Sequence, residues 1–179
     1  TEQTAYLTPQ KALAQPSGRG LGNISEDLYA LGVCTAIMLR SADPMEGMSE
    51  KEILQMKLAQ GSYMTLTNKD RFSGGILELL RGLLQDDTAQ RWTMDEVLAW
   101  LEGQRLVPKQ GVKRIKAGRP IILGKQKFYF AETLAMEMPE HLAEAAQQIE
   151  GDQLEQWINR SLEDSKKVEK LEAAIRTAR

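Results

Sequence analysis

The chain offers few side chains that could carry out covalent chemistry. It contains one cysteine, Cys34, and one histidine, His141, in 179 residues. Cys34 lies inside an apolar stretch, where we expect a buried and unreactive thiol. His141 lies in an acidic stretch with no cysteine or second histidine at metal-ligand spacing, so we expect a solvated side chain and no metal. A single cysteine precludes a disulfide within the chain and suits a reducing, cytoplasmic compartment.

A block of basic residues is the one pattern that suggests binding. Residues 105–127 carry eight Lys and Arg side chains, and no acid lies between Glu102 and Glu132. Such a block could meet nucleic acid, phosphate or an acidic partner. It could also neutralise the helices that follow, since residues 132–179 carry 11 acids against 6 bases. We favour neutralisation, because few aromatic residues are available to stack on bases and the net charge is only −2.

Residues 27–39 are the element expected to position the rest of the chain. They read DLYALGVCTAIML, with Thr35 as the only polar residue after Asp27. A helix that is apolar on every face must be buried on every face. This one is too short to cross a membrane, which takes about 18 or more apolar residues. The stretch therefore predicts the central helix of a helical core, with no membrane partner.

Caps and periodicity predict the elements on either side. Residues 1–24 are rich in Pro and Gly and predict a loop with one helical turn near 9–14, and Asn23 or Ser25 can cap the central helix. Capping boxes begin two later helices, at Ser49 with Glu52 and at Thr93 with Glu96. The pattern predicts helices over 48–58, 72–85 and 94–102, and an irregular stretch over 63–71.

The C-terminal part changes character after Gly103. Residues 120–130 predict two short strands around a turn at Gly124. Breaks at Pro139 and Gly151 then divide an acidic, helical composition into segments near 131–137, 139–150, 152–162 and 164–177.

Three motifs resemble the end of a protein kinase domain. Residues 27–33, DLYALGV, resemble the Asp-x-Trp/Tyr-x-Leu-Gly signature on the central helix of the kinase C-terminal lobe. Residues 83–96, LLQDDTAQRWTMDE, resemble the late motif Leu-Leu-x-x-Asp-Pro-x-x-Arg-x-Thr-x-x-Glu. Residues 6–10, YLTPQ, resemble the Tyr-x-Ala-Pro-Glu that ends the activation segment. The resemblance covers residues 1–103 and implies a helical C-lobe.

The resemblance implies structural roles for particular residues. In the family, the aspartate matched by Asp27 holds the backbone of the catalytic loop. The arginine matched by Arg91 pairs with the activation-segment glutamate, tying that segment to the late helices. Gln10 stands at the glutamate position, so a hydrogen bond to Arg91 remains available but an ion pair does not. Thr8 and Thr88 replace the usual alanine and proline, which suggests a degenerate member.

The motif of residues 6–10 adds further candidates. It implies structural or regulatory roles for Tyr6 and Pro9, and it makes Leu7 and Thr8 candidate docking residues. No catalytic residue is expected, because the sequence lacks the glycine-rich loop, strand lysine, His-Arg-Asp and Asp-Phe-Gly motifs. ATP and Mg²⁺ would enter only through an upstream N-terminal half. The chain begins without Met, and we expect it to be part of a longer kinase or pseudokinase.

The expected fold is mainly α. It comprises a kinase-like C-lobe over 1–103, a basic linker over 104–118, and a β-hairpin with a small helical extension over 119–179. The extension resembles, loosely, the helical regions appended to some bacterial kinase-like chains.

The expected function is a non-catalytic scaffold and docking surface in a cytoplasmic Ser/Thr kinase-like signalling protein. The alternative is a freestanding helical interaction module, and nucleic-acid binding through 105–127 is the less favoured partner assignment. Without a catalytic loop and its preceding helix, residues 28–39 would be exposed. We therefore expect the extension, a second copy or a protein partner, such as the missing kinase half, to cover them.

Overall fold

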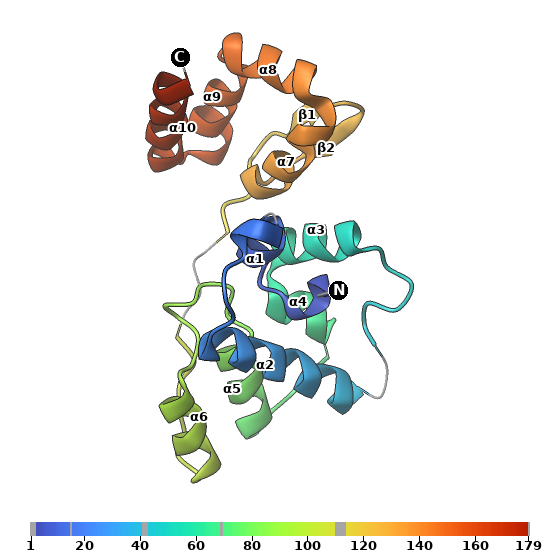
Figure 1. Ribbon diagram of the computed structural model, residues 1–179, viewed down its shortest axis with the longest axis vertical. Coiled ribbons are helices and arrows are strands. Elements are labelled where there is room, and N and C mark those ends of the chain that lie inside the picture. Colours follow the sequence, from blue (N-terminus) through green and yellow to red (C-terminus); the bar gives the residue numbers. More distant parts are fainter. Residues whose placement is uncertain (1–2, 15, 41–42, 69, 110–113, 179) are drawn as a thin grey trace. The chain divides into compact units, whose positions relative to one another are not determined.

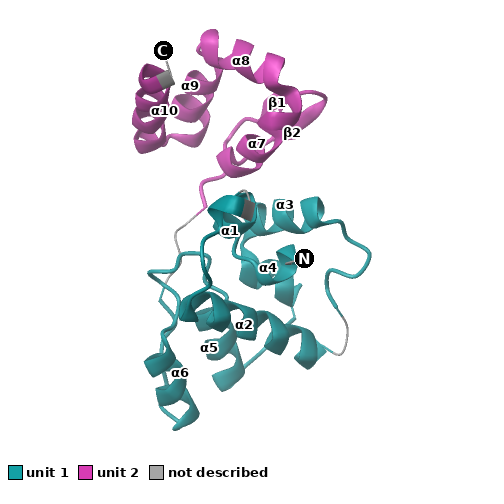
Figure 2. Cartoon of the chain, in the orientation of Figure 1, with its two compact units in different colours: residues 1–113 teal, residues 114–179 magenta. Residues whose placement is uncertain are grey.

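The computed structural model describes residues 3–14, 16–40, 43–68, 70–109 and 114–178. The chain divides into two compact units, residues 1–113 and 114–179 (Figure 2). It is mainly helical, as the sequence predicts, and the described residues form a single two-stranded sheet. No helix in the described ranges is long and apolar enough to span a membrane.

Unit 1 packs short helices around one long helix, α2 (Ile24–Arg40) (Figure 1). Asn23 begins α2 with a reciprocal cap: its Oδ1 accepts from Glu26 N at 3.1 Å, and Glu26 Oε2 accepts from Asn23 N at 3.2 Å. The other elements of unit 1 are η1 (Thr4–Tyr6), α1 (Pro9–Leu13), η2 (Pro16–Gly18), α3 (Glu50–Gln60), α4 (Ser62–Thr67), α5 (Gly74–Leu83) and α6 (Met94–Leu101).

Helix α2 is buried on one side only, contrary to the prediction that every face is buried. Its buried residues are Leu28, Tyr29, Gly32, Val33 and Ala36. At Gly32 the helix comes so close to α5 that an added Cβ would lie 2.8 Å from Leu83 Cβ. The other side is left exposed because the packed helices of unit 1 cover only the buried face.

Most of the shorter helices confirm the sequence pattern. The helical turn near 9–14 forms as α1, and both predicted capping boxes form, at α3 and α6. The prediction of an irregular stretch over 63–71 is wrong for residues up to 67, which belong to α4. Its helical signal is hidden because polar side chains are buried here: the Thr65 and Thr67 hydroxyls donate to carbonyls four residues earlier.

Unit 2 confirms the predicted hairpin and helical regions. Its elements are β1 (Ile121–Leu123), β2 (Gln126–Phe128), α7 (Ala131–Glu137), the 3-10 turn η3 (Met138–His141), α8 (Leu142–Glu150), α9 (Gln153–Trp157), the π-helical turn η4 (Ile158–Leu162) and α10 (Ser165–Ala178). The antiparallel register pairs Ile121 with Phe128 and Ile122 with Lys127. Paired residues share a face of the hairpin, and that alternation decides which side is buried.

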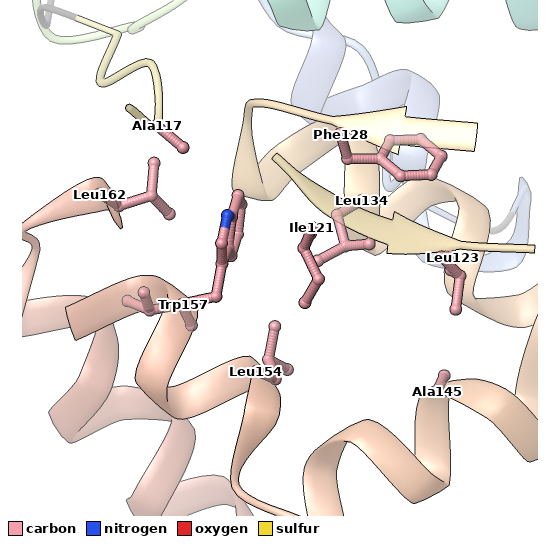
Figure 3. Close-up of a cluster of buried hydrophobic side chains, with 10 residues drawn as sticks. Ala117, Ile121, Leu123, Phe128, Leu134, Ala145, Leu154, Trp157 and Leu162 are labelled. Carbon is pink, nitrogen blue, oxygen red and sulfur yellow. The ribbon is translucent and has the colours of Figure 1, made fainter. Parts of the chain in front are cut away.

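The inner face of the hairpin packs on the helices of unit 2 (Figure 3). Ile121, Leu123 and Phe128 belong to one core cluster with Leu134 of α7 and Trp157 of α9. Side chains from α8 and α9 also bind the hairpin main chain. Their bonds run from Gln148 Nε2 to the Ile122 carbonyl at 2.6 Å, from Trp157 Nε1 to the Arg119 carbonyl at 2.7 Å, and from Gly124 N to Glu144 Oε2 at 2.8 Å.

Candidate functional site

The N-terminal segment (residues 3–14) is held to α3 by a buried lysine. Lys57 has a relative exposure of 0%. Its Nζ donates to the main-chain carbonyls of Thr4 at 2.9 Å, Ala5 at 2.6 Å and Leu7 at 2.8 Å. At the start of α3, Glu50 accepts from Thr4 N at 2.7 Å. Hydrogen bonds with a charged partner are stronger than neutral ones, so α3 clamps this segment by its backbone.

The environment of Lys57 acts on its charge in two directions. Burial lowers the pKa of Lys57 from 10.5 to about 7, although the Asp86 and Glu50 carboxylates raise it. The Tyr29 ring lies 5.2 Å from Nζ and adds a cation–π contact. An ammonium has three N–H donors whereas the neutral amine has two, so the three carbonyl acceptors match the charged form.

Arg91 is a second buried cation, and its hydrogen-bond partners do not include the predicted one. The side chain is 2% exposed, and burial lowers the pKa of its guanidinium. It donates to the carbonyls of Gln85 and Ser25, both at 2.9 Å, to Ser25 Oγ at 3.0 Å and to the Asp86 carbonyl at 3.4 Å. Gln10 is exposed and takes no part. The predicted tie from Arg91 to Gln10 is therefore wrong, because the guanidinium donates its hydrogen bonds to the start of α2 and to the loop after α5.

Tyr29 connects the two cations. Its ring lies 5.1 Å from the Arg91 guanidinium, besides its contact with Lys57. Its hydroxyl donates to Ser62 Oγ at 2.7 Å, and the Ser62 hydroxyl donates to the Asp86 carboxylate, which also accepts from Ser62 N at 3.3 Å. A buried network of this kind fixes the relative positions of the helices that contribute to it. Its chemical role is to hold the scaffold together.

The predicted docking residues face inward. Leu7 and Thr8 are buried, so their assignment as docking residues is wrong. Pro9 is buried at the first position of α1, and the Thr8 hydroxyl caps that helix by accepting from Lys11 N at 3.3 Å. Tyr6 is half-buried against the core of unit 1. The clamp on the backbone brings these side chains against the helices, where no partner can reach Leu7 or Thr8.

Asp27 heads an exposed row on α2. Asp27, Leu31, Cys34 and Met38 are spaced by four, three and four residues, which places them on one side of a helix. We call these four residues the α2 ridge. All are exposed, Leu31 at 47% and Met38 at 79%, and the Asp27 side chain has no hydrogen bond or ion pair within the described chain. The prediction of a buried Cys34 is wrong, because the thiol lies on the uncovered side of the helix.

The basic block divides between the two units. In unit 1, Arg105 pairs with Glu78 and Lys109 lies 3.2 Å from Glu96. In unit 2, Lys116, Arg119, Lys125 and Lys127 are all exposed, and none forms an ion pair with a residue that the structure describes. Among the carboxylates that follow, Glu132 and Asp164 bind Lys167, and Glu172 lies close to Arg176.

His141 lies against the hairpin turn. A Cβ added to Gly124 would be 2.8 Å from the imidazole Cε1, so glycine is needed there for contact as well as for its φ of 60°. His141 Nε2 is 3.9 Å from the buried Glu137 carboxylate. Across the described ranges no group of three or more His, Cys, Asp or Glu side chains is arranged to hold a metal.

Sequence reasoning missed Lys57, although a signal was present. Ile53, Leu54 and Leu58 form the buried face of α3, and Lys57 lies on that same face. Lysine is rarely buried without a partner, so its position in an apolar row predicts a buried acceptor group. The carbonyls that accept are 50 to 53 residues earlier in the chain, and no local pattern identifies them.

Comparisons with protein-family models, with curated proteins and with solved structures found no match to this chain.

Proposed function

We propose that this chain is the non-catalytic, C-terminal part of a Ser/Thr protein kinase-like signalling protein of the cytoplasm. In this proposal residues 1–103 act as a helical scaffold. The α2 ridge receives the kinase-type catalytic loop together with the helix that precedes it. The three sequence motifs carry the likeness to the kinase family, and the exposed ridge supplies the surface.

The observation that carries the proposal is the chemistry of the α2 ridge. Three apolar side chains, Leu31, Cys34 and Met38, follow Asp27 along one exposed side of the central helix. Exposed apolar surface of this kind marks an interaction site, and a carboxylate at its head can accept hydrogen bonds from free main-chain N–H groups. A loop followed or preceded by an apolar helix fits both features, and the kinase catalytic loop and its neighbouring helix have that composition.

The bonds from Lys57 favour a fixed, scaffolding role for the N-terminal segment over a role as a conformational switch. In the family, the glutamate–arginine pair ties the end of the activation segment to the late helices. Gln10 stands at the glutamate position here, and the corresponding segment is held by three bonds from Lys57 to its main chain. Backbone bonds do not depend on the side chains of the segment, so they fix it whatever its sequence.

The test starts from the coding sequence 5′ of the Thr1 codon. We expect a reading frame with a strand lysine, His-Arg-Asp and Asp-Phe-Gly or their degenerate remnants. Its product, made as a separate polypeptide and mixed with this chain, should protect Cys34 from a thiol reagent. Absence of such a frame, or unchanged Cys34 reactivity in the mixture, would overturn the proposal.

A pair of double variants controls the experiment. Leu31→Glu with Met38→Glu places charges on the α2 ridge and should abolish the protection. Leu98→Glu with Leu101→Glu places the same charges on exposed apolar positions of α6 and should leave it intact. If both double variants lose protection equally, the ridge is not the binding surface.

A further inference from the structure

The hairpin of unit 2 and the residues next to it in sequence carry exposed cations and an exposed aromatic ring. Ile122 and Lys127 are cross-strand partners and both point away from the core, with Ile122 52% exposed. Tyr129 follows two residues after Lys127, at the same phase of the alternation, and is 36% exposed. Lys116 places its Nζ 5.1 Å from the Tyr129 ring. We call this set the hairpin surface: Lys116, Arg119, Ile122, Lys125, Lys127 and Tyr129.

The charges of the hairpin surface are not neutralised by the protein. Its four cations have no carboxylate partner within the described residues, whereas Arg105 and Lys109 of the same sequence block do. Neutralisation of the acidic helices by direct ion pairs is therefore not observed for these four cations. In those helices Glu132 pairs with Lys167, and Glu172 lies close to Arg176. Exposed cations without a carboxylate partner raise the local concentration of anions.

The hairpin is also held rigidly in place. Gln148 and Trp157 donate to the carbonyls of Ile122 and Arg119, and Glu144 accepts from Gly124 N. Three side chains of α8 and α9 therefore fix the main chain from which the cations project. A fixed backbone lowers the entropy lost when a ligand binds its side chains.

We propose that the hairpin surface binds single-stranded nucleic acid. Lysine ammonium groups would contact successive phosphates, and Tyr129 and Ile122 would offer an aromatic and an apolar surface to an unpaired base. Single strands are bound in this way by proteins that combine a positive track with exposed rings. The inference concerns unit 2 alone and does not depend on the function proposed for unit 1.

The composition of the hairpin surface favours this ligand over two other anionic partners. An acidic peptide could form ion pairs with the cations, but it would not need an exposed aromatic ring. An anionic membrane favours apolar side chains that insert, and the surface offers only Ile122 beside the partly exposed Tyr129. In a duplex the bases stack on one another and cannot stack on Tyr129, so the hairpin surface would contact only the phosphates.

The test measures fluorescence anisotropy of a labelled, mixed-sequence oligonucleotide of about 16 nucleotides, with the full chain. Four phosphate contacts predict that log affinity falls with log salt at a slope of about −2.8, or about 50-fold between about 50 mM and about 200 mM salt. The triple variant Lys116→Gln, Lys125→Gln, Lys127→Gln should reduce that slope to about −0.7. Arg160→Gln, Lys166→Gln, Lys170→Gln removes the same charge elsewhere in unit 2 and should leave the slope unchanged.

A second pair of variants isolates the ring. Tyr129→Leu should weaken binding at least about fivefold, because the stacking surface is lost, while Tyr129→Phe keeps the ring and should restore it. Circular dichroism establishes that each variant is folded.

Three results would overturn the proposal. The first is no binding at the lower salt concentration, and the second is equal loss in both triple variants. The third is binding of a duplex, poly-glutamate or phosphatidylserine vesicles at least as tight as that of the single strand, with no effect of Tyr129→Leu.

Discussion

The Lys57 ammonium lies 2.6 Å from the carbonyl oxygen of Ala5, although 52 residues separate the two in the sequence. Together with the bonds to Thr4 and Leu7, this contact makes a charged side chain the attachment point for the N-terminal segment. The attachment uses main-chain atoms of the segment. Its removal is therefore the sharpest test of how unit 1 is held together.

Lys57→Met should lower the free energy of unfolding by about 2–4 kcal/mol. The methionine keeps most of the apolar stem, but three carbonyls lose their donor, and a buried acceptor without a partner costs about 1–3 kcal/mol. Urea unfolding measures the loss, and limited proteolysis should cut the freed segment before the rest of unit 1. The exposed Lys170→Met on α10 is the matched control and should change little. A small effect with the segment still protected would contradict the clamp.

The stability that depends on Lys57 should rise with pH between about 7 and 10.5. Burial lowers the pKa of Lys57 to about 7 in the folded chain, and the unfolded chain keeps about 10.5. Between these values the unfolded state binds more protons, so the free energy of unfolding rises, by up to about 1.4 kcal/mol per pH unit. Below about pH 7 both states are charged and the slope disappears.

The measurement compares wild type with Lys57→Met at several pH values, so that every other titrating group cancels. The difference in unfolding free energy should increase from neutral to alkaline pH. A difference that stays flat over this range would mean that the three carbonyls keep Lys57 protonated in the folded state.

Arg91→Lys should cost about 2–4 kcal/mol of unfolding free energy, because a lysine cannot reproduce the planar set of donors to Gln85, Ser25 and Asp86. Gln10→Glu should shift it by less than about 0.5 kcal/mol, since Gln10 is exposed and the hydrogen bonds of Arg91 go to Gln85, Ser25 and Asp86. Chemical denaturation measures both. Stabilisation by Gln10→Glu that disappears in an Arg91→Lys background would instead indicate the kinase-type ion pair.

Gly82→Ala should destabilise unit 1 by about 2–4 kcal/mol, because overpacking a full core costs about 1–3 kcal/mol and sometimes more. An added Cβ would lie 2.2 Å from the ring of Trp92, which is buried in the core. Thermal unfolding monitored by tryptophan fluorescence measures the change. At Gly18 an added Cβ meets nothing within 4 Å, so Gly18→Ala is the control and should be close to neutral. Equal effects at the two sites would show that contact with the Trp92 ring does not determine the cost.

Local patterns predicted most of the fold. The caps at Ser49 and Thr93, and the turn at Gly124, depend on residues only a few positions apart, and the structure contains each of them. The α4 helix was missed because Thr65 and Thr67 are buried through hydrogen bonds to their own helix, which polarity alone does not reveal.

The contacts that define the candidate sites are long-range, and the sequence could not supply them. An apolar row indicates burial, but it does not tell how many neighbours the fold provides, so Cys34 and Leu31 were expected to be covered. A basic block indicates positive charge, but only the spatial arrangement separates the paired Arg105 from the unpaired Lys127. Both errors concern which partner a side chain meets.

The large sequence separation between Lys57 and its acceptors also affects the order in which unit 1 folds. Contacts between residues 50 or more positions apart form only after the intervening chain has closed a large loop, and such closures come late. An interaction absent from the folding transition state changes the unfolding rate and leaves the folding rate nearly unaltered. Lys57 should therefore set how long unit 1 stays folded, while the locally capped helices set how fast it folds.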